Sequence, residues 1–188
     1  MNVVGRALNK ALNKAGDRLA NPARASDADK LRRAVSGKTV LVTGASYGIG
    51  EATARRLAAA EATVLVVARS EERLNDLAAS INAGGGQAVA YPTDLTDEAA
   101  VGALTKQITE EHGALDIVVS NAGKSLRRSL HHQYDRPHDF QRTIDINYLG
   151  PIWLLLGLLP AMRENRSGHI VNVSSVGVRV VPGPQWGA

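Results

Sequence analysis

A glycine-rich stretch directly after an apolar run constrains the fold of this chain more than any other feature. Residues 39–43 (Thr-Val-Leu-Val-Thr) have the apolar, β-branched character of a buried parallel strand. Gly44, Gly48 and Gly50 follow, and a helical pattern of small and apolar residues begins at once. A strand that turns through glycines into a helix brings unpaired backbone N–H groups to the positive helix end, which suits a pyrophosphate. The stretch therefore predicts a nucleotide-binding turn, with a tight structural turn as the alternative.

The rest of the chain alternates apolar strand patterns with amphipathic helix patterns. This alternation is typical of an α/β fold with a Rossmann-type, doubly wound parallel sheet. Strands are expected at residues 39–43, 63–68, 88–91, 117–120 and 169–173. Helices are expected at 48–60, from 70 or 71 to 84, from 96 or 97 to 112, and at 140–163, the last with a bend at Pro151.

Residues 1–36 have a different composition and are predicted to be a basic, amphipathic helical extension of a domain at 37–188. Asn21-Pro22 is expected to end a first helix, and Ser26 or Asp27 to cap a second, shorter one. The two alternatives for residues 1–20 are packing on protein, which we favour, and peripheral contact with an anionic membrane surface.

Charge and composition narrow the classes of function. Residues 1–38 contain nine Lys and Arg against three Asp, whereas the remainder contains 13 basic against 15 acidic residues. The basic character therefore belongs to the extension, and we expect no nucleic-acid partner. The absence of cysteine and of a secretory signal or long apolar run favours a cytoplasmic protein. No carboxylate or cysteine cluster accompanies the histidines at 131, 132 and 138, so no metal site is expected.

The end of the second expected strand bears on the cofactor. In dinucleotide-binding folds, an acidic residue about 20 positions after the glycine turn binds the ribose 2′-hydroxyl, whereas an arginine accommodates a 2′-phosphate. Ala68 and Arg69 stand 18 and 19 residues beyond Gly50, and neither is acidic. The sequence therefore favours NADP(H) over NAD(H), with a solvated Arg69 as the alternative.

The octapeptide at residues 43–50 (Thr-Gly-Ala-Ser-Tyr-Gly-Ile-Gly) resembles the cofactor turn of the short-chain dehydrogenase/reductase family. The resemblance extends from about residue 37 to the last residue. It implies a Rossmann fold and an oxidoreductase that acts on a carbonyl or alcohol. The cofactor-binding residues that it implies in this turn are Gly44, Ser46, Tyr47, Gly48, Ile49 and Gly50.

Two further motifs of the resemblance follow the third and fourth expected strands. Asp94-Leu95 is similar to the family's adenine-binding pair, although Asp94 alone could simply cap or turn the chain. Asn121-Ala122-Gly123 is similar to the family's N-A-G motif, in which the asparagine both ties neighbouring strands together and borders the cofactor.

The resemblance also implies catalytic roles for Ser175 and Asn147. Ser175, after the fifth expected strand, corresponds to the serine that polarises a substrate carbonyl. Asn147 corresponds to the helical asparagine that holds a water molecule in the proton relay. Judged on the residues alone, Asn147 could equally satisfy neighbouring backbone groups.

The sequence departs from the family pattern at two places. The family's proton donor is the tyrosine of a Tyr-x-x-x-Lys motif about a dozen residues beyond the serine, and the chain stops 13 residues beyond Ser175. Tyrosines stand at 47, 91, 134 and 148, and the residues four positions later are Glu51, Leu95, His138 and Ile152. Glu61 stands where the family generally has glycine; if this position needs a positive φ, the side chain costs roughly 1 kcal/mol.

Residues 123–129 and 134–142 resemble family members that reduce long-chain acyl substrates, including fatty acyl-CoA reductases. Arg127 and Arg128 are candidates to meet the phosphates of an acyl carrier, with a solvated basic loop as the alternative. We therefore expect an NADP(H)-dependent oxidoreductase, homo-oligomeric as a complete protein, for a small-molecule or acyl-carrier-linked substrate. The competing hypothesis is a truncated, non-catalytic nucleotide-binding remnant.

Overall fold

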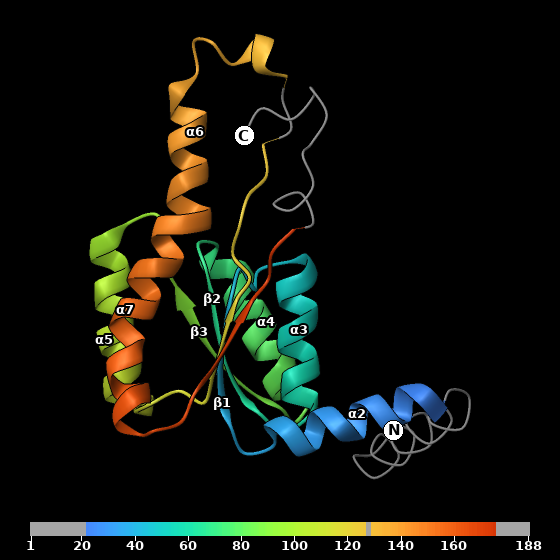
Figure 1. The fold of residues 1–188 in the computed structure, drawn as a ribbon. Helices are drawn as coiled ribbons and strands as arrows, with labels where there is room; N and C mark the ends of the chain where they lie inside the picture. The colour runs from blue at the N-terminus through green and yellow to red at the C-terminus, as the bar shows by residue number, and fades with distance from the viewer. Residues whose placement is uncertain (1–21, 127–128, 176–188) are drawn as a thin grey trace.

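The computed structural model describes residues 22–126 and 129–175 and contains one five-stranded parallel sheet (Figure 1). The strand order is β3-β2-β1-β4-β5. The strands are β1 (Thr39–Thr43), β2 (Thr63–Ala68), β3 (Gln87–Pro92), β4 (Ile117–Ser120) and β5 (His169–Asn172). The order changes direction between β1 and β4, and ligands of doubly wound sheets bind beyond the carboxyl ends of the strands at such a switch point. The predicted fold class is confirmed.

Helices cover both faces of the sheet. In Figure 1, α3 and α4 lie on one side and α5 and α7 on the other. The helices are α2 (Pro22–Val35), α3 (Gly48–Ala59), α4 (Glu71–Ala83), α5 (Glu98–His112), α6 (Pro137–Ile144) and α7 (Gly150–Glu164), with a short 3₁₀ turn at Leu130–His132. Of the two caps expected for α5, Thr96 or Asp97, the structure has Asp97, whose side chain accepts a hydrogen bond from the Ala100 N–H at 3.1 Å.

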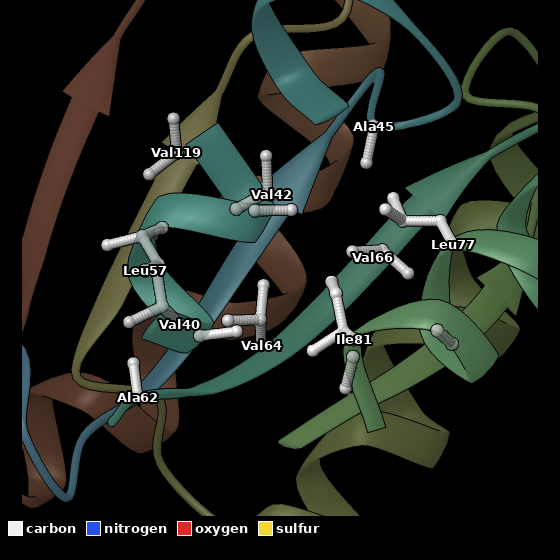
Figure 2. Packing of buried hydrophobic residues seen from close by; sticks show 14 of the residues in the cluster. Val40, Val42, Ala45, Leu57, Ala62, Val64, Val66, Leu77, Ile81 and Val119 are labelled. Atoms are coloured by element: carbon white, nitrogen blue, oxygen red, sulfur yellow. The ribbon is translucent and has the colours of Figure 1, made fainter. Parts of the chain in front are cut away.

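Apolar residues line both faces of the central strands, as expected for strands buried on both sides. Val40 and Val42 pack with α3 and α4, whereas Leu41, between them, packs on the opposite face with α5 and α7. The same alternation holds in β2. Figure 2 shows the first of these clusters, in which Leu57 from α3 and Ile81 from α4 lie over the valines.

The helix before the domain begins earlier than the sequence suggested. We expected a cap at Ser26 or Asp27, but α2 starts at Pro22. Proline suits the first turn of a helix because its fixed φ is helical and its missing N–H would have no intrahelical partner there. Val35 is buried and Leu31 packs against the same core cluster, so this part of the predicted extension is attached to the sheet domain. The first predicted helix, at residues 1–20, lies outside the described residues.

The long helix expected at 140–163 is three consecutive segments. A π-helical turn, η2 (Asp145–Leu149), joins α6 to α7, and Pro151 lies in the first turn of α7. In Figure 1 the helical path bends between α6 and α7. We expected the bend at Pro151, which lies just after this point. Proline lacks the backbone N–H of a regular helical hydrogen bond, and its ring clashes with the carbonyl group one turn earlier. The wider π-helical turn ahead of Pro151 makes room for that ring.

By length and composition, the span Pro137–Glu164 is sufficient to cross a membrane, which the short apolar run in the sequence did not suggest. In the structure, Leu154, Leu158 and Met162 of α7 are buried in the cluster shared with α5. One side of α7 therefore packs on the sheet domain, whereas only 17% of the apolar window as a whole is buried.

A buried tyrosine joins the edge strand β3 to the end of α5. The Tyr91 hydroxyl donates to Glu111 Oε2 at 2.5 Å, and His112 Nε2 lies 2.6 Å from the phenolic oxygen. Because the single phenolic proton points to Glu111, the His112 ring donates in its turn. Burial, reinforced by the carboxylate, raises the pKa of Tyr91, while the hydrogen bond from Tyr91 lowers the pKa of Glu111.

Candidate functional site: a cleft at the carboxyl edge of the sheet

The loops that follow β1, β2, β3 and β4 meet at one edge of the sheet and enclose a cavity of about 410 Å³. This volume is within the range of pockets that hold one small ligand. Seven of the predicted cofactor residues line the cavity. They are Gly44, Ser46, Tyr47, Arg69, Leu95, Ala122 and Gly123.

The glycine turn has three separate structural roles. Gly44 has a φ of 66°, and a Cβ atom there would lie 2.9 Å from the Ala122 Cα. A Cβ on Gly50 would lie 2.2 Å from the Gly44 carbonyl oxygen, so only glycine lets α3 start this close to β1. Gly48 has a φ of 62°, and the space around it is open to 4 Å, where a ligand can approach the backbone. Ile49 is exposed on the first turn of the helix.

Thr43 ties β1 to the loop after β4, and the sequence reasoning did not identify it as a site residue. Its hydroxyl oxygen accepts hydrogen bonds from the Asn121 and Ala122 N–H groups, both at 2.9 Å. The Asn121 side-chain amide donates in return to the Thr43 carbonyl oxygen at 2.9 Å. These contacts fix the two loops on either side of the switch point, so Asn121 holds the cleft together without lining the cavity.

Two arginines form one side of the cleft, and we name Arg69 and Arg73 together the arginine wall. Arg69 follows β2, and Arg73 lies one turn later in α4; both line the cavity. Arg69 Nη1 is 3.8 Å from Asp94 Oδ2, a loose pair whose two side chains are 68% and 41% exposed. Arg73 was not predicted, because the position that distinguishes the two cofactors in such folds is the end of the second strand, whereas Arg73 lies in the helix that follows.

Asp94 forms the turn that follows β3. Its Oδ1 accepts from the Thr96 N–H at 2.9 Å and from the Thr96 hydroxyl at 2.8 Å. This is the turn-forming alternative that its position suggested. The adenine-binding role stays a prediction, and it would use the adjoining Leu95, which lines the cavity.

The predicted catalytic residues lie in two different settings. The Asn147 side chain accepts from the Lys124 N–H at 2.9 Å and donates to the Lys124 carbonyl oxygen at 2.8 Å. Its amide is thus engaged with backbone, as one of our two hypotheses had it, and its role in a proton relay stays a prediction. Ser175 follows β5 at the same edge of the sheet and is exposed.

The lining also includes Lys124, Arg142, Asp145 and Ile146, which we name together the far wall. None of these four was predicted as a cofactor residue. Lys124 directly follows the predicted Gly123, whereas Arg142, Asp145 and Ile146 reach the cavity only because α6 and η2 are placed over it. Arg127 and Arg128 lie outside the described residues. In the described ranges on either side of them, no group of three or more His, Asp or Glu side chains is arranged to hold a metal ion.

The residues present fit a phosphate-bearing dinucleotide. The described lining combines four cationic side chains with a single carboxylate, and the backbone of Gly48, in the glycine turn whose Gly44, Ser46 and Tyr47 line the cavity, has open space around it. Leu95, Ala122 and Ile146 supply apolar surface between the charged walls. Cationic side chains and free backbone N–H groups at a helix start recognise phosphate, and the apolar patch can accept a base.

Comparison with known proteins identifies the family of this chain. The family model described as short chain dehydrogenase matches residues 38–188. An uncharacterized oxidoreductase of Mycobacterium tuberculosis is 50% identical over 161 residues, which is 84% of this chain and 47% of the relative. The fatty acyl-CoA reductase of Acinetobacter baylyi is 48% identical over 147 residues, or 78% of this chain and 50% of the relative. The chain thus spans about half the length of these curated relatives.

Solved structures of similar proteins share the fold. A metagenomic short-chain oxidoreductase in complex with NADP is 37% identical, with a TM-score of 0.71 over 75% of this chain and 63% of that one. The NAD⁺-bound xylitol dehydrogenase is 31% identical, with a TM-score of 0.73 over 80% of this chain and 57% of that one. Together with the cleft, these matches show that the chain belongs to the short-chain dehydrogenase family of oxidoreductases.

Proposed function

We propose that the chain binds NADP(H) in preference to NAD(H) and that its oxidoreductase activity acts on a long-chain acyl or ketoacyl compound. The arginine wall carries this proposal. It occupies the end of β2, where an acidic residue would select the ribose 2′-hydroxyl, and Arg69 and Arg73 together can face a 2′-phosphate. The relative from Acinetobacter baylyi, named a fatty acyl-CoA reductase, supports the substrate class.

The chain's own residues divide the work in this proposal. Gly44 and Gly48 give backbone access to the pyrophosphate, and Thr43 and Asn121 keep that loop in place. The bound dinucleotide supplies the hydride. Ser175 holds the oxygen of the carbonyl so that negative charge developing on it is stabilised.

Titration of the cofactors tests the proposal. Arg69→Ala in the 188-residue chain is expected to weaken NADPH binding on the order of tenfold, since a hydrogen bond between charged groups contributes about 1.5–3 kcal/mol. Binding of NADH should change less than about twofold. Arg56→Ala, an exposed arginine of α3 that does not line the cleft, is the matched control. Equal losses for the two cofactors would contradict the preference.

A second candidate function is dinucleotide binding without turnover. It is favoured by one sequence observation: none of the four tyrosines is followed by lysine four positions later. Cofactor titration does not separate the two candidates, because both require the cleft. Turnover does separate them, because only the first candidate oxidises NADPH in the presence of a carbonyl substrate.

We further propose that the protein associates with a second copy of itself through the long helix. Ile144, Tyr148, Ile152 and Leu156 recur every four residues and are 49%, 63%, 39% and 66% exposed. Their spacing places them on one side of the helix, and an apolar stripe can pack on its own copy about a twofold axis. Sedimentation of the chain and of Leu156→Ser tests this: we expect a concentration-dependent dimer that the substitution weakens. Monomers at all concentrations would contradict the proposal.

A further inference from the structure

The cleft carries positive charge on both of its walls. Lys124 and Arg142 line the cavity together with the arginine wall, and Asp145 is the only carboxylate in the described lining. Residues 39–188 as a whole contain more acidic than basic side chains. The cations are therefore concentrated where the ligand would lie, and the far wall contributes half of them.

The helical segments that carry most of the far wall pack on the turn that follows β3. Ile146 packs in the core cluster that contains Leu95 of the β3–α5 turn. A Cβ on Gly150 would lie 2.3 Å from the Leu95 carbonyl oxygen, so η2 and the start of α7 pass directly over that turn. Arg142 lies one helical turn before Ile146 and lines the same cavity. This cavity is also lined by Arg69, which follows β2, and by Thr93, which follows β3.

The Arg142 guanidinium is not neutralised by a neighbouring acid. Within the described ranges 22–126 and 129–175, it is exposed and takes part in no ion pair or side-chain hydrogen bond. Arg136, on the same part of the chain, differs: its Nε donates to Asp139 at 2.7 Å. The nearby Asp145 carboxylate instead accepts from Gln141 at 2.7 Å. An uncompensated guanidinium in a cavity wall is available for an anionic group of a ligand, and its planar fork matches phosphate.

We propose that Arg142 is a cofactor-specificity residue that contacts the 2′-phosphate of NADP(H) from the far wall of the cavity that Arg69 and Arg73 also line. The inference rests on the cofactor function proposed above. Because a cavity of about 410 Å³ accommodates one ligand, both walls face the same dinucleotide. A dinucleotide without the 2′-phosphate offers Arg142 no such group. The helix that carries Asn147 therefore also takes part in selecting the cofactor.

Arg142→Gln in the full 188-residue chain tests this by direct binding, with isothermal titration of NADPH, NADH, 2′,5′-ADP and 5′-ADP. The two 2′-phosphorylated ligands should bind on the order of tenfold more weakly, and the other two should change less than about twofold. The difference should shrink as salt is raised, because the contact is exposed and electrostatic. Arg163→Gln, an exposed arginine near the other end of the same helix, should leave all four affinities unchanged.

Each outcome separates this inference from the one on which it rests. If the wild-type chain prefers NADPH and Arg142→Gln retains that preference in full, the role of Arg142 is refuted and the cofactor proposal stands. Equal losses for all four ligands would assign Arg142 to the adenosine and refute its part in specificity. If the wild-type chain binds none of the four ligands, both proposals are refuted. Unchanged thermal unfolding of the variant excludes a folding defect as the cause of a loss.

Discussion

Glu61 adopts a left-handed backbone conformation, with a φ of 69°, in the turn between α3 and β2. The sequence showed that a non-glycine residue here would be strained if φ were positive, and the structure meets that condition. The side chain compensates in part. Its carboxylate lies 2.5 Å from Arg32 Nη2 and accepts from the Ser36 hydroxyl at 3.1 Å. Glu61 therefore fastens the end of α2 to the sheet domain.

We expect Glu61→Gly to change the free energy of unfolding by less than about 1 kcal/mol. Relief of roughly 1 kcal/mol of backbone strain is offset by the loss of a half-exposed ion pair worth about 0–1 kcal/mol. In an Arg32→Ala background the ion pair is already absent. The same substitution should then stabilise the chain by about 1 kcal/mol, measured by urea denaturation of the four variants of a double-mutant cycle. Equal effects in the two backgrounds would show that the pair contributes nothing.

At the scale of the element, α5 and α7 pack closely because a glycine faces a threonine. A Cβ on Gly157 would lie 2.3 Å from the Thr105 Oγ1 and 2.6 Å from its Cβ. Thr105 is 5% exposed, and its hydroxyl donates to the Gly102 carbonyl oxygen at 3.1 Å, so it has little freedom to move. The position of α7, and with it the far wall of the cleft, depends on this contact.

Gly157→Ala is expected to destabilise the chain by about 1–2 kcal/mol. Overpacking costs about 1–3 kcal/mol, and the better helix propensity of alanine returns up to about 1 kcal/mol. Gly102→Ala is the matched control, since nothing lies within 4 Å of a Cβ at that helical glycine. It should gain about 0.5–1 kcal/mol in the same thermal or urea unfolding measurement. If both variants were stabilised alike, the helices could not be as close as described.

At the scale of the whole molecule, the chain combines a cleft that fits a dinucleotide with a sequence in which no tyrosine is followed by lysine four positions later. It spans 47–50% of the length of the curated relatives that we compared, although its matches cover 78–84% of its own. Carbonyl reduction requires an acid for the oxygen that receives the proton, and a positioned acid contributes about 10²–10⁴-fold. Ser175 can stabilise that oxygen, but a serine hydroxyl is a poor acid at neutral pH.

We expect the 188-residue chain alone to show no NADPH oxidation with long-chain acyl or ketoacyl substrates above the uncatalysed rate. The reason for this expectation is that the chain has no Tyr-x-x-x-Lys pair. Without the tyrosine no side chain donates the proton, and without the lysine none orients the nicotinamide ribose. The assay follows NADPH absorbance, and NADPH titration of the same sample is the control for a folded cleft. An extension carrying Tyr-x-x-x-Lys should restore turnover. Robust oxidation by the unextended chain, abolished by Ser175→Ala, would contradict the argument.

The alternation of elements and the glycine turn were predictable from the sequence because both are local. Buried strands appear as apolar runs such as residues 63–68, and Asp97 marks a helix start with its own side chain. Most of the predicted boundaries fell within one or two residues of those in the structure. The local signals gave the wrong boundary at the start of α2, because the helix begins at Pro22 and not at Ser26 or Asp27. They also gave no sign of the π-helical turn η2.

The far wall of the cleft and the contacts between side chains far apart in the sequence were decided by the tertiary structure alone. Arg142 is separated from Arg69 by more than 70 residues of chain, and no periodicity links the two. They face one cavity because α7 packs on α5 and thereby places α6 and η2 over the β3–α5 turn. The same holds for Glu61 and Arg32, which are 29 residues apart. Sequence patterns report which residues share a strand or a helix face, whereas the packing of helices on the sheet determines which faces meet.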